Sequence, residues 1–297
     1  MNSEEIKQLT EHSIGQLVES LRQGKSESLV EYLRMAARFH RYSLHNVLLI
    51  ALQKPNASYV AGFRTWQKLE HFVRKGEKGI WILAPMLKRL VEADSSRREI
   101  ETKRIVGFRS AYVFDVSQTD GAPLPTSDTV SGDPVVYRCR LLAYAVSQGI
   151  SVEYSAGIAP ARGMSLGGRI QLLPDMTPAE EFATLVHEVA HELLHRGRRR
   201  ESTTRTVRET EAETVAFVVC SAVQLETASA AEDYIGLYRG DTETLLESLQ
   251  HVQLAANPIL NFLLPSKEER AAASALERPI SPGERPGIRR AQPPQSA

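Results

Sequence analysis

Apolar residues recur at helical spacing in the first part of the chain. They predict helices over residues 4–22, 28–39 and 43–52, with Ser43 as the N-cap of the third and Pro55 beyond its end. Residues 79–83 and 110–116 are apolar runs typical of strands. The charged residues 86–108 between them predict a hairpin with its turn near 94–98. This part of the chain is therefore expected to be α+β.

A second set of elements follows residues 118–134, where Gly, Pro, Ser, Thr and Asp predict a linker or a long surface loop. Beyond it we expect a helix over 135–149, strands at 150–154 and 168–173, and helices to about residue 264. The predicted fold class is α+β in two domains, an α+β domain of residues 1–125 and a mainly helical domain of 135–276, joined by a linker at 126–134. Residues 277–297, which lack periodicity, are expected to be disordered.

Composition narrows the class of protein. Apolar residues make up 42% of the chain, yet no apolar run reaches the roughly 18 to 20 residues that span a bilayer. The start of the chain is acidic and polar, which is untypical of a signal peptide, and two cysteines cannot form a disulfide framework. We therefore expect a cytoplasmic protein without a membrane partner.

A capped, largely apolar helix carries candidate metal chemistry. Thr177 and Glu180 fit a capping box at its start, and His187, Glu188 and His191 form an HExxH motif within it. Residues four apart share one helix face, so both imidazoles can bind one ion. Glu188 projects about 100° away, where it can accept a proton from water without binding the metal.

A second predicted helix supplies a candidate third ligand. Glu211 lies on the same stripe as the apolar residues of 207–219, whereas Glu209 and Glu213 lie off that stripe, so Glu211 is the predicted ligand. Two histidines and one glutamate leave a position free for water, the arrangement of catalytic zinc sites. The sequence thus predicts a zinc site, exchangeable for manganese or cobalt, and a gluzincin-like metallopeptidase. His195 is interpreted as a capping residue or one that contacts a ligand, because it lies one turn too far along the helix.

The zero net charge of the chain conceals a basic region. Residues 34–110 hold 16 Lys and Arg against 6 Asp and Glu, together with both tryptophans. Such mixtures of cations and flat rings bind single-stranded nucleic acid. Tryptophans are more often core residues, so the prediction depends mainly on the basic side chains. The predicted DNA-binding residues are Tyr42, Phe63, Arg64, Trp66, Lys68, Arg74, Lys75, Lys78 and Trp81.

Several stretches together resemble a known family. They are RYSLHNVLLIALQKPNASYVAGFRTWQKLEHFVRKGEKGIWILAP, AYVFDVSQTDG, HEVAHELLH and ETEAETVAFVV. In this combination the chain resembles the ArdC antirestriction proteins of conjugative plasmids, to about residue 264. The resemblance implies an N-terminal single-stranded DNA-binding domain and a C-terminal zincin-like metallopeptidase domain. It also implies the metal ligands His187, His191 and Glu211, and the catalytic Glu188.

The resemblance further implies protection of incoming conjugated DNA from host restriction, with single-stranded DNA and host restriction-modification proteins as partners. Two alternatives remain open. The metal domain could be a structural or protein-docking module without turnover, or the chain could be an intracellular peptidase, which would leave the separation of charge unexplained.

Overall fold

The structure of this protein is a computed structural model. It describes residues 8, 12, 14–20, 23, 27–93, 99–122, 134–225 and 242–265, and of residues 89–93, 99–103 and 242 the backbone alone. One compact unit comprises Met1–Leu263, and the remaining residues form a second unit. The predicted disordered tail and most of the predicted linker lie outside the described residues. The domain division at 126–134 therefore stays a prediction. Helices and strands together confirm the mixed α+β class.

The first helices follow the predicted pattern. Residues 14–20 are helical, α2 spans Glu27–Arg38, and α3 spans Leu44–Gln53. The Ser43 hydroxyl accepts the backbone N–H of Asn46 at 3.4 Å, so the predicted N-cap is confirmed. In the compact unit α2 packs against α8 (Arg205–Ala222), a contact between the two halves of the chain.

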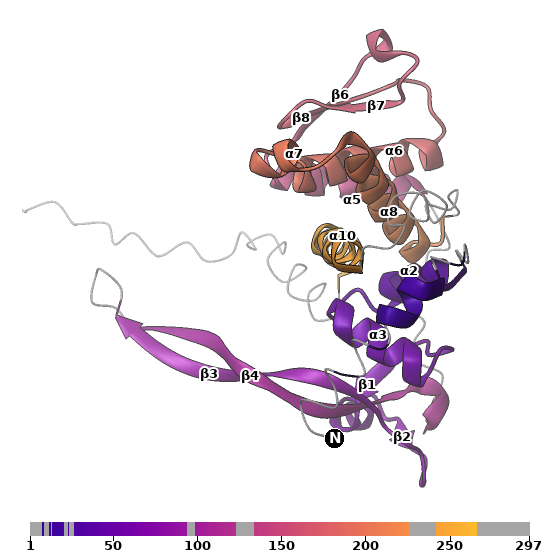
Figure 1. Cartoon of the computed structure of the whole chain (residues 1–297), viewed down its shortest axis with the longest axis vertical. Coiled ribbons are helices and arrows are strands. Elements are labelled where there is room, and N and C mark those ends of the chain that lie inside the picture. Colours follow the sequence, from indigo (N-terminus) through magenta and orange to yellow (C-terminus); the bar gives the residue numbers. More distant parts are fainter. Residues whose placement is uncertain are drawn as a thin grey trace, which may run out of the picture. The chain divides into compact units, whose positions relative to one another are not determined.

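A three-stranded antiparallel sheet follows, in the order β1-β4-β3. β1 spans Val60–Gly62, and the predicted hairpin is confirmed by β3, Ile80–Ala93, and β4, Glu99–Asp115, which pair as a long ribbon (Figure 1). Between β1 and β3 lie the short helix α4, Phe63–Lys68, and β2, Phe72–Val73. β2 pairs with β5, Thr119–Asp120, so the predicted linker begins later than residue 118.

Side chains of α3 satisfy the outer edge of β3. The Asn46 amide donates to the Leu83 carbonyl at 2.9 Å and accepts the Leu83 N–H at 2.8 Å. Gln53 makes the same pair of bonds to the Trp81 backbone, at 2.9 and 3.1 Å. Because unpaired backbone groups at a buried edge are costly, the two amides replace a missing strand there.

A buried carboxylate closes the end of β4. The Asp115 side chain is fully buried and accepts backbone N–H groups from Ser58, Tyr59 and Ser117 at 2.7, 3.1 and 2.9 Å. Burial alone would raise the pKa of Asp115, but these hydrogen bonds lower it overall. Asp115 therefore ties the segment before β1 to the 3₁₀ turn Val116–Gln118.

The second half of the chain is mainly helical. α5 spans Pro134–Ser147, α6 Pro178–Leu194, α7 Arg198–Ser202 and α10 Thr242–Leu263, and α6 packs against α5 and α8. A small sheet in the order β6-β8-β7 lies between α5 and α6 in the sequence. It comprises β6, Ser151–Tyr154, β7, Gly163–Ser165, and β8, Arg169–Leu172. Among the described residues, no helix is both long and apolar enough to cross a membrane.

Candidate functional site

Helix α6 presents the HExxH motif. Its start is the predicted capping box, in which Thr177 accepts the Glu180 N–H and Glu180 accepts the Thr177 N–H at 3.1 Å. Phe182, Val186 and Val189 on this helix are fully buried. This burial fixes the rotation of α6 about its axis and turns His187 and His191 toward a pocket of about 810 Å³.

Three ligand atoms converge at this pocket. His187 Nε2 and His191 Nε2 lie 3.0 Å apart, and Glu209 Oε2 lies 3.6 and 3.5 Å from them. Ligand atoms about 2.05 Å from a tetrahedral zinc ion are about 3.3 Å from one another. The three separations bracket that value, so the donor set fits a metal ion without rearrangement.

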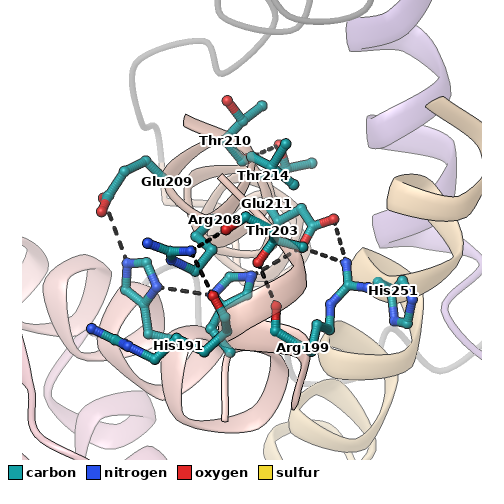
Figure 2. A network of polar contacts seen from close by, with 12 residues as sticks. His191, Arg199, Thr203, Arg208, Glu209, Thr210, Glu211, Thr214 and His251 are labelled. Atoms are coloured by element: carbon teal, nitrogen blue, oxygen red, sulfur yellow. Dashed lines mark hydrogen bonds and ion pairs between the residues drawn. The ribbon is translucent and has the colours of Figure 1, made fainter. Parts of the chain in front are cut away.

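The prediction that Glu211 joins the two histidines is wrong. Glu211 is 1% exposed and its carboxylate bonds to His195 Nε2 at 2.9 Å and to Arg199 Nη2 at 2.6 Å. Figure 2 shows Glu209 reaching His191, while Glu211 points to Arg199. The structure thus assigns the place beside the histidines to Glu209.

The correction has a simple physical reason. The prediction places the metal on the buried stripe of α8, but the helix is buried on most sides from Thr210 onward, so burial does not mark the side that faces the metal. The side that lines the pocket carries Arg205, Glu209, Glu213 and Ala216, which follow helical spacing. A catalytic site must admit water, so its carboxylate ligand belongs on the polar side of the helix rather than on the apolar stripe.

Each candidate histidine ligand is also held at its second ring nitrogen. His187 Nδ1 lies 3.3 Å from Glu213 Oε2, and His191 Nδ1 lies 2.9 Å from His195 Nδ1. Both Nε2 atoms are thereby left for the shared centre. Metal-bound histidines are commonly oriented in this way.

The charges of the cluster shift its pKa values strongly. Burial opposes the charged ring, yet Glu209 and Glu213 raise the pKa of His187 to about 9. Burial and the neighbouring His187 lower the pKa of His191 to about 4. The hydrogen bond from His187 lowers the pKa of Glu209 to about 2. The carboxylates beside the two imidazoles therefore favour a positive charge at this centre, either a proton on His187 or a cation.

Glu188 is placed for proton transfer. It lines the same pocket, it is 7% exposed, and burial raises its pKa. A Cβ atom at Gly163 would lie 2.7 Å from Glu188 Cγ and Oε1 and from Thr184 Cγ2. Only glycine allows β7 to approach Glu188 so closely, so this strand holds the carboxyl against the pocket.

Glu192 was not predicted as a site residue, although it directly follows the motif. Its buried carboxylate accepts the Ser165 hydroxyl at 2.6 Å and the Gly167 and Gly168 N–H groups at 2.8 and 2.7 Å. Arg196 Nε donates to it at 2.7 Å. Glu192 therefore fastens the turn between β7 and β8 onto α6.

Among the predicted DNA-binding aromatic residues, the prediction for Trp66 is wrong. It is fully buried, and its indole N–H donates to the Phe114 carbonyl at 2.9 Å, so it cannot stack on a base. Tyr42 is half-buried and its hydroxyl donates to the Val60 carbonyl at 3.2 Å. Phe63 is 51% exposed and Trp81 is half-buried, so both rings remain candidates.

The predicted cations are exposed, but they are not equivalent. Arg64, Lys68, Lys75 and Lys78 are all exposed. The guanidinium of Arg74, although partly exposed, donates to Glu77 at 2.9 Å, to Asp120 at 3.4 Å and to backbone carbonyls. It stabilises the β2–β5 region and is less suited to a phosphate contact.

Sequence reasoning missed further exposed rings. Tyr112 is 57% and Phe108 56% exposed. Tyr112 is the register partner of Trp81, and both lie on the face of the ribbon opposite the buried Ile80, Ile82 and Val113. The alternation of β3 and β4 could have revealed this outer aromatic row.

Comparison with known proteins gives a family match in the N-terminal part of the chain. Residues 4–114 match the N-terminal domain of anti-restriction factor ArdC. A relative, an uncharacterized protein of Bacillus anthracis, is 21% identical over 306 residues, covering 88% of this chain and 52% of its own length. The chain thus spans about half the length of this relative.

Two crystal structures of antirestriction protein ArdC from plasmid R388 are also similar. The metal-free form is 20% identical, covers 86% of this chain and 97% of its own, and has a TM-score of 0.49. The Mn(II)-bound form is 19% identical, with coverages of 86% and 98% and a TM-score of 0.49. The match of residues 4–114 shows that this part of the chain is similar to the N-terminal domain of anti-restriction factor ArdC.

Proposed function

We propose that this protein binds single-stranded DNA in the cytoplasm, protects incoming conjugated DNA from host restriction, and carries a metal-dependent peptidase site. The observation that carries the enzymatic part is the convergence of three donor atoms from His187, His191 and Glu209 on one pocket. The match of residues 4–114 to the N-terminal domain of anti-restriction factor ArdC supports the antirestriction and DNA-binding parts.

The proposed ligands are His187, His191 and Glu209, with zinc as the expected ion and manganese or cobalt as substitutes. When bound, the ion supplies Lewis acidity for a carbonyl group and for water. Glu188, buried against β7 with a raised pKa, accepts a proton from water and passes it to the leaving amine. Glu213 and His195 hold the two imidazoles in place.

A peptide is the substrate that best suits the neighbouring strand. β7 pairs with β8 along one edge, and no other described strand pairs with its second edge. Gly163, Met164 and Ser165 line the pocket beside Glu188. An extended peptide can add to such an edge through backbone hydrogen bonds, which brings its scissile amide next to the proposed metal centre.

For DNA binding we propose the outer face of the β3–β4 ribbon together with α4. Trp81, Tyr112 and Phe63 would stack on bases, while Arg64 and Lys68 would contact phosphates. Stacking of this kind tolerates any sequence and requires unpaired bases, so single strands should bind more tightly than duplex DNA.

The experiment that tests the enzymatic part compares wild type with Glu188→Gln. Both are assayed for cleavage of host restriction subunits and for protection of conjugated DNA, after equal metal content is established. Cleavage by wild type alone supports a working peptidase. If both proteins protect DNA equally and cleave nothing, the metal domain is a structural or docking module.

A further inference from the structure

A row of buried polar groups extends from His191 away from the pocket. His191 Nδ1 lies 2.9 Å from His195 Nδ1, and His195 Nε2 lies 2.9 Å from Glu211 Oε2. Arg199 Nη2 donates to both oxygens of Glu211, at 2.6 and 2.8 Å. The side chain of His195 is fully buried and that of Glu211 is 1% exposed. Water therefore has little access to this row, and its members must satisfy one another.

The direction of each hydrogen bond follows from the groups themselves. The ionised carboxylate of Glu211 can only accept, so His195 Nε2 carries a proton and donates. When His195 holds one proton, on Nε2, its Nδ1 has a lone pair, which accepts from His191. The proton of His191 is thus on Nδ1, and its Nε2 presents a lone pair to the pocket.

Here we propose that His195 and Glu211 are positioning residues, which fix the tautomer and orientation of His191 for metal binding. The inference rests on the proposed metal site. Glu211 lies outside the ligand cluster, but it orients His195, and His195 in turn orients His191.

Arg199 stabilises the buried carboxylate of Glu211. A buried carboxylate without a partner is costly, and Arg199 balances its charge through the two bonds to Glu211. The backbone adds a further restraint, because His195 is the C-cap of α6 and its N–H donates to the His191 carbonyl at 2.9 Å. The relative placement of the two rings is therefore fixed by backbone and side chains together.

The equivalent support of His187 is weaker. Its Nδ1 partner Glu213 is 42% exposed and 3.3 Å away, where solvent can compete. The row through His195 and Glu211 is thus the more rigid of the two supports. Partners of this kind typically change metal affinity about 10- to 100-fold when removed.

The test measures zinc affinity of the full chain by competition with a chelator. His195→Leu should bind zinc about 10- to 100-fold more weakly than wild type. His195→Asn should recover part of that loss, because its amide oxygen can accept from His191 Nδ1 in place of the ring nitrogen. The matched control is His71→Leu, a buried histidine whose ring bonds to the Thr119 hydroxyl at 3.0 Å; its zinc affinity should equal that of wild type.

A second measurement on wild type needs no variant. Nitrogen-15 NMR of the zinc-loaded protein should show the proton of His195 on Nε2 and that of His191 on Nδ1. If wild type binds zinc while His195→Leu binds it equally well, the positioning role is refuted and the metal site stands. If His191 carries its proton on Nε2 in the zinc-loaded protein, the positioning role and the assignment of His191 Nε2 as a ligand atom are both refuted. If wild type binds no zinc, the proposed metal site itself fails, and the inference fails with it.

Discussion

Replacement of Glu209 by alanine tests the assignment of the third ligand. Zinc bound by four protein ligands has an apparent binding free energy of about 10–16 kcal/mol, or about 2.5–4 kcal/mol for each ligand. The Glu209 carboxylate oxygen lies 3.5 and 3.6 Å from the two imidazole nitrogens, which is ligand spacing, so it should contribute a full share. Glu209→Ala should therefore weaken zinc binding about 100- to 1,000-fold.

Glu213 provides the matched comparison. It lies one turn further along α8 and is comparably exposed, at 42% against 51% for Glu209. Its oxygen lies near Nδ1 of His187 rather than in the ligand cluster. Glu213→Ala should therefore cost about 10-fold or less in affinity, at the low end of the range for groups that orient a ligand.

The assay is chelator competition on purified protein, checked by elemental analysis, which should give about one zinc per wild-type chain. Circular dichroism of each variant verifies that α8 remains folded. The assignment is refuted if Glu209→Ala keeps wild-type affinity. A loss in Glu213→Ala that exceeds the loss in Glu209→Ala would also refute it, because the two carboxylates would then have exchanged roles.

Four further predictions concern the N-terminal region. Trp81→Ala should weaken binding of single-stranded DNA by about 1–3 kcal/mol in fluorescence anisotropy, whereas Trp66→Ala should lose about 3–5 kcal/mol of folding stability in thermal denaturation. Asn46→Leu leaves two backbone groups of β3 unpaired and should lower the free energy of unfolding in urea by about 2–6 kcal/mol. The pKa of Asp115 is depressed in the folded state, so its contribution to stability is present above the unfolded value of about 3.9 and is lost as pH falls through the folded pKa. Asp115→Asn should therefore flatten the acid side of the stability profile; an unchanged profile would contradict this.

Local patterns allowed much of the fold to be predicted. The capping box at Thr177 and the HExxH spacing depend on residues within two turns of each other, so α6 could be predicted closely. The hairpin of β3 and β4 was marked by apolar runs around a charged middle. The strand β7 was missed, because Gly163–Ser165 has no strand signature and exists through its pairing with β8.

The two tryptophans show where pattern reasoning stops. Both lie in the same basic stretch, yet Trp66 is core and Trp81 lies on the outer face of β3. The buried neighbours Ile80 and Ile82 alternate with Trp81, so its outward direction was within reach of the sequence. The burial of Trp66 depends on the packing of α4 against the end of β4, which no local pattern specifies.

The glutamates of α8 show why a ligand cannot be chosen from burial alone. Glu211 is buried, but Arg199 and His195 already balance its charge, so it does not need a metal. Among the described ion pairs, Glu209 has one arginine partner, Arg205. The Arg205 Nε atom lies 4.0 Å from Glu209 Oε1, and its side chain is 89% exposed, so solvent screens the interaction. Against the effect of burial, the carboxylates of Glu209, Glu213 and Glu188 act directly on the His187 imidazole and raise its pKa to about 9. A divalent cation at the three converging donors would neutralise the charge of these carboxylates, so the electrostatics and the geometry point to the same place.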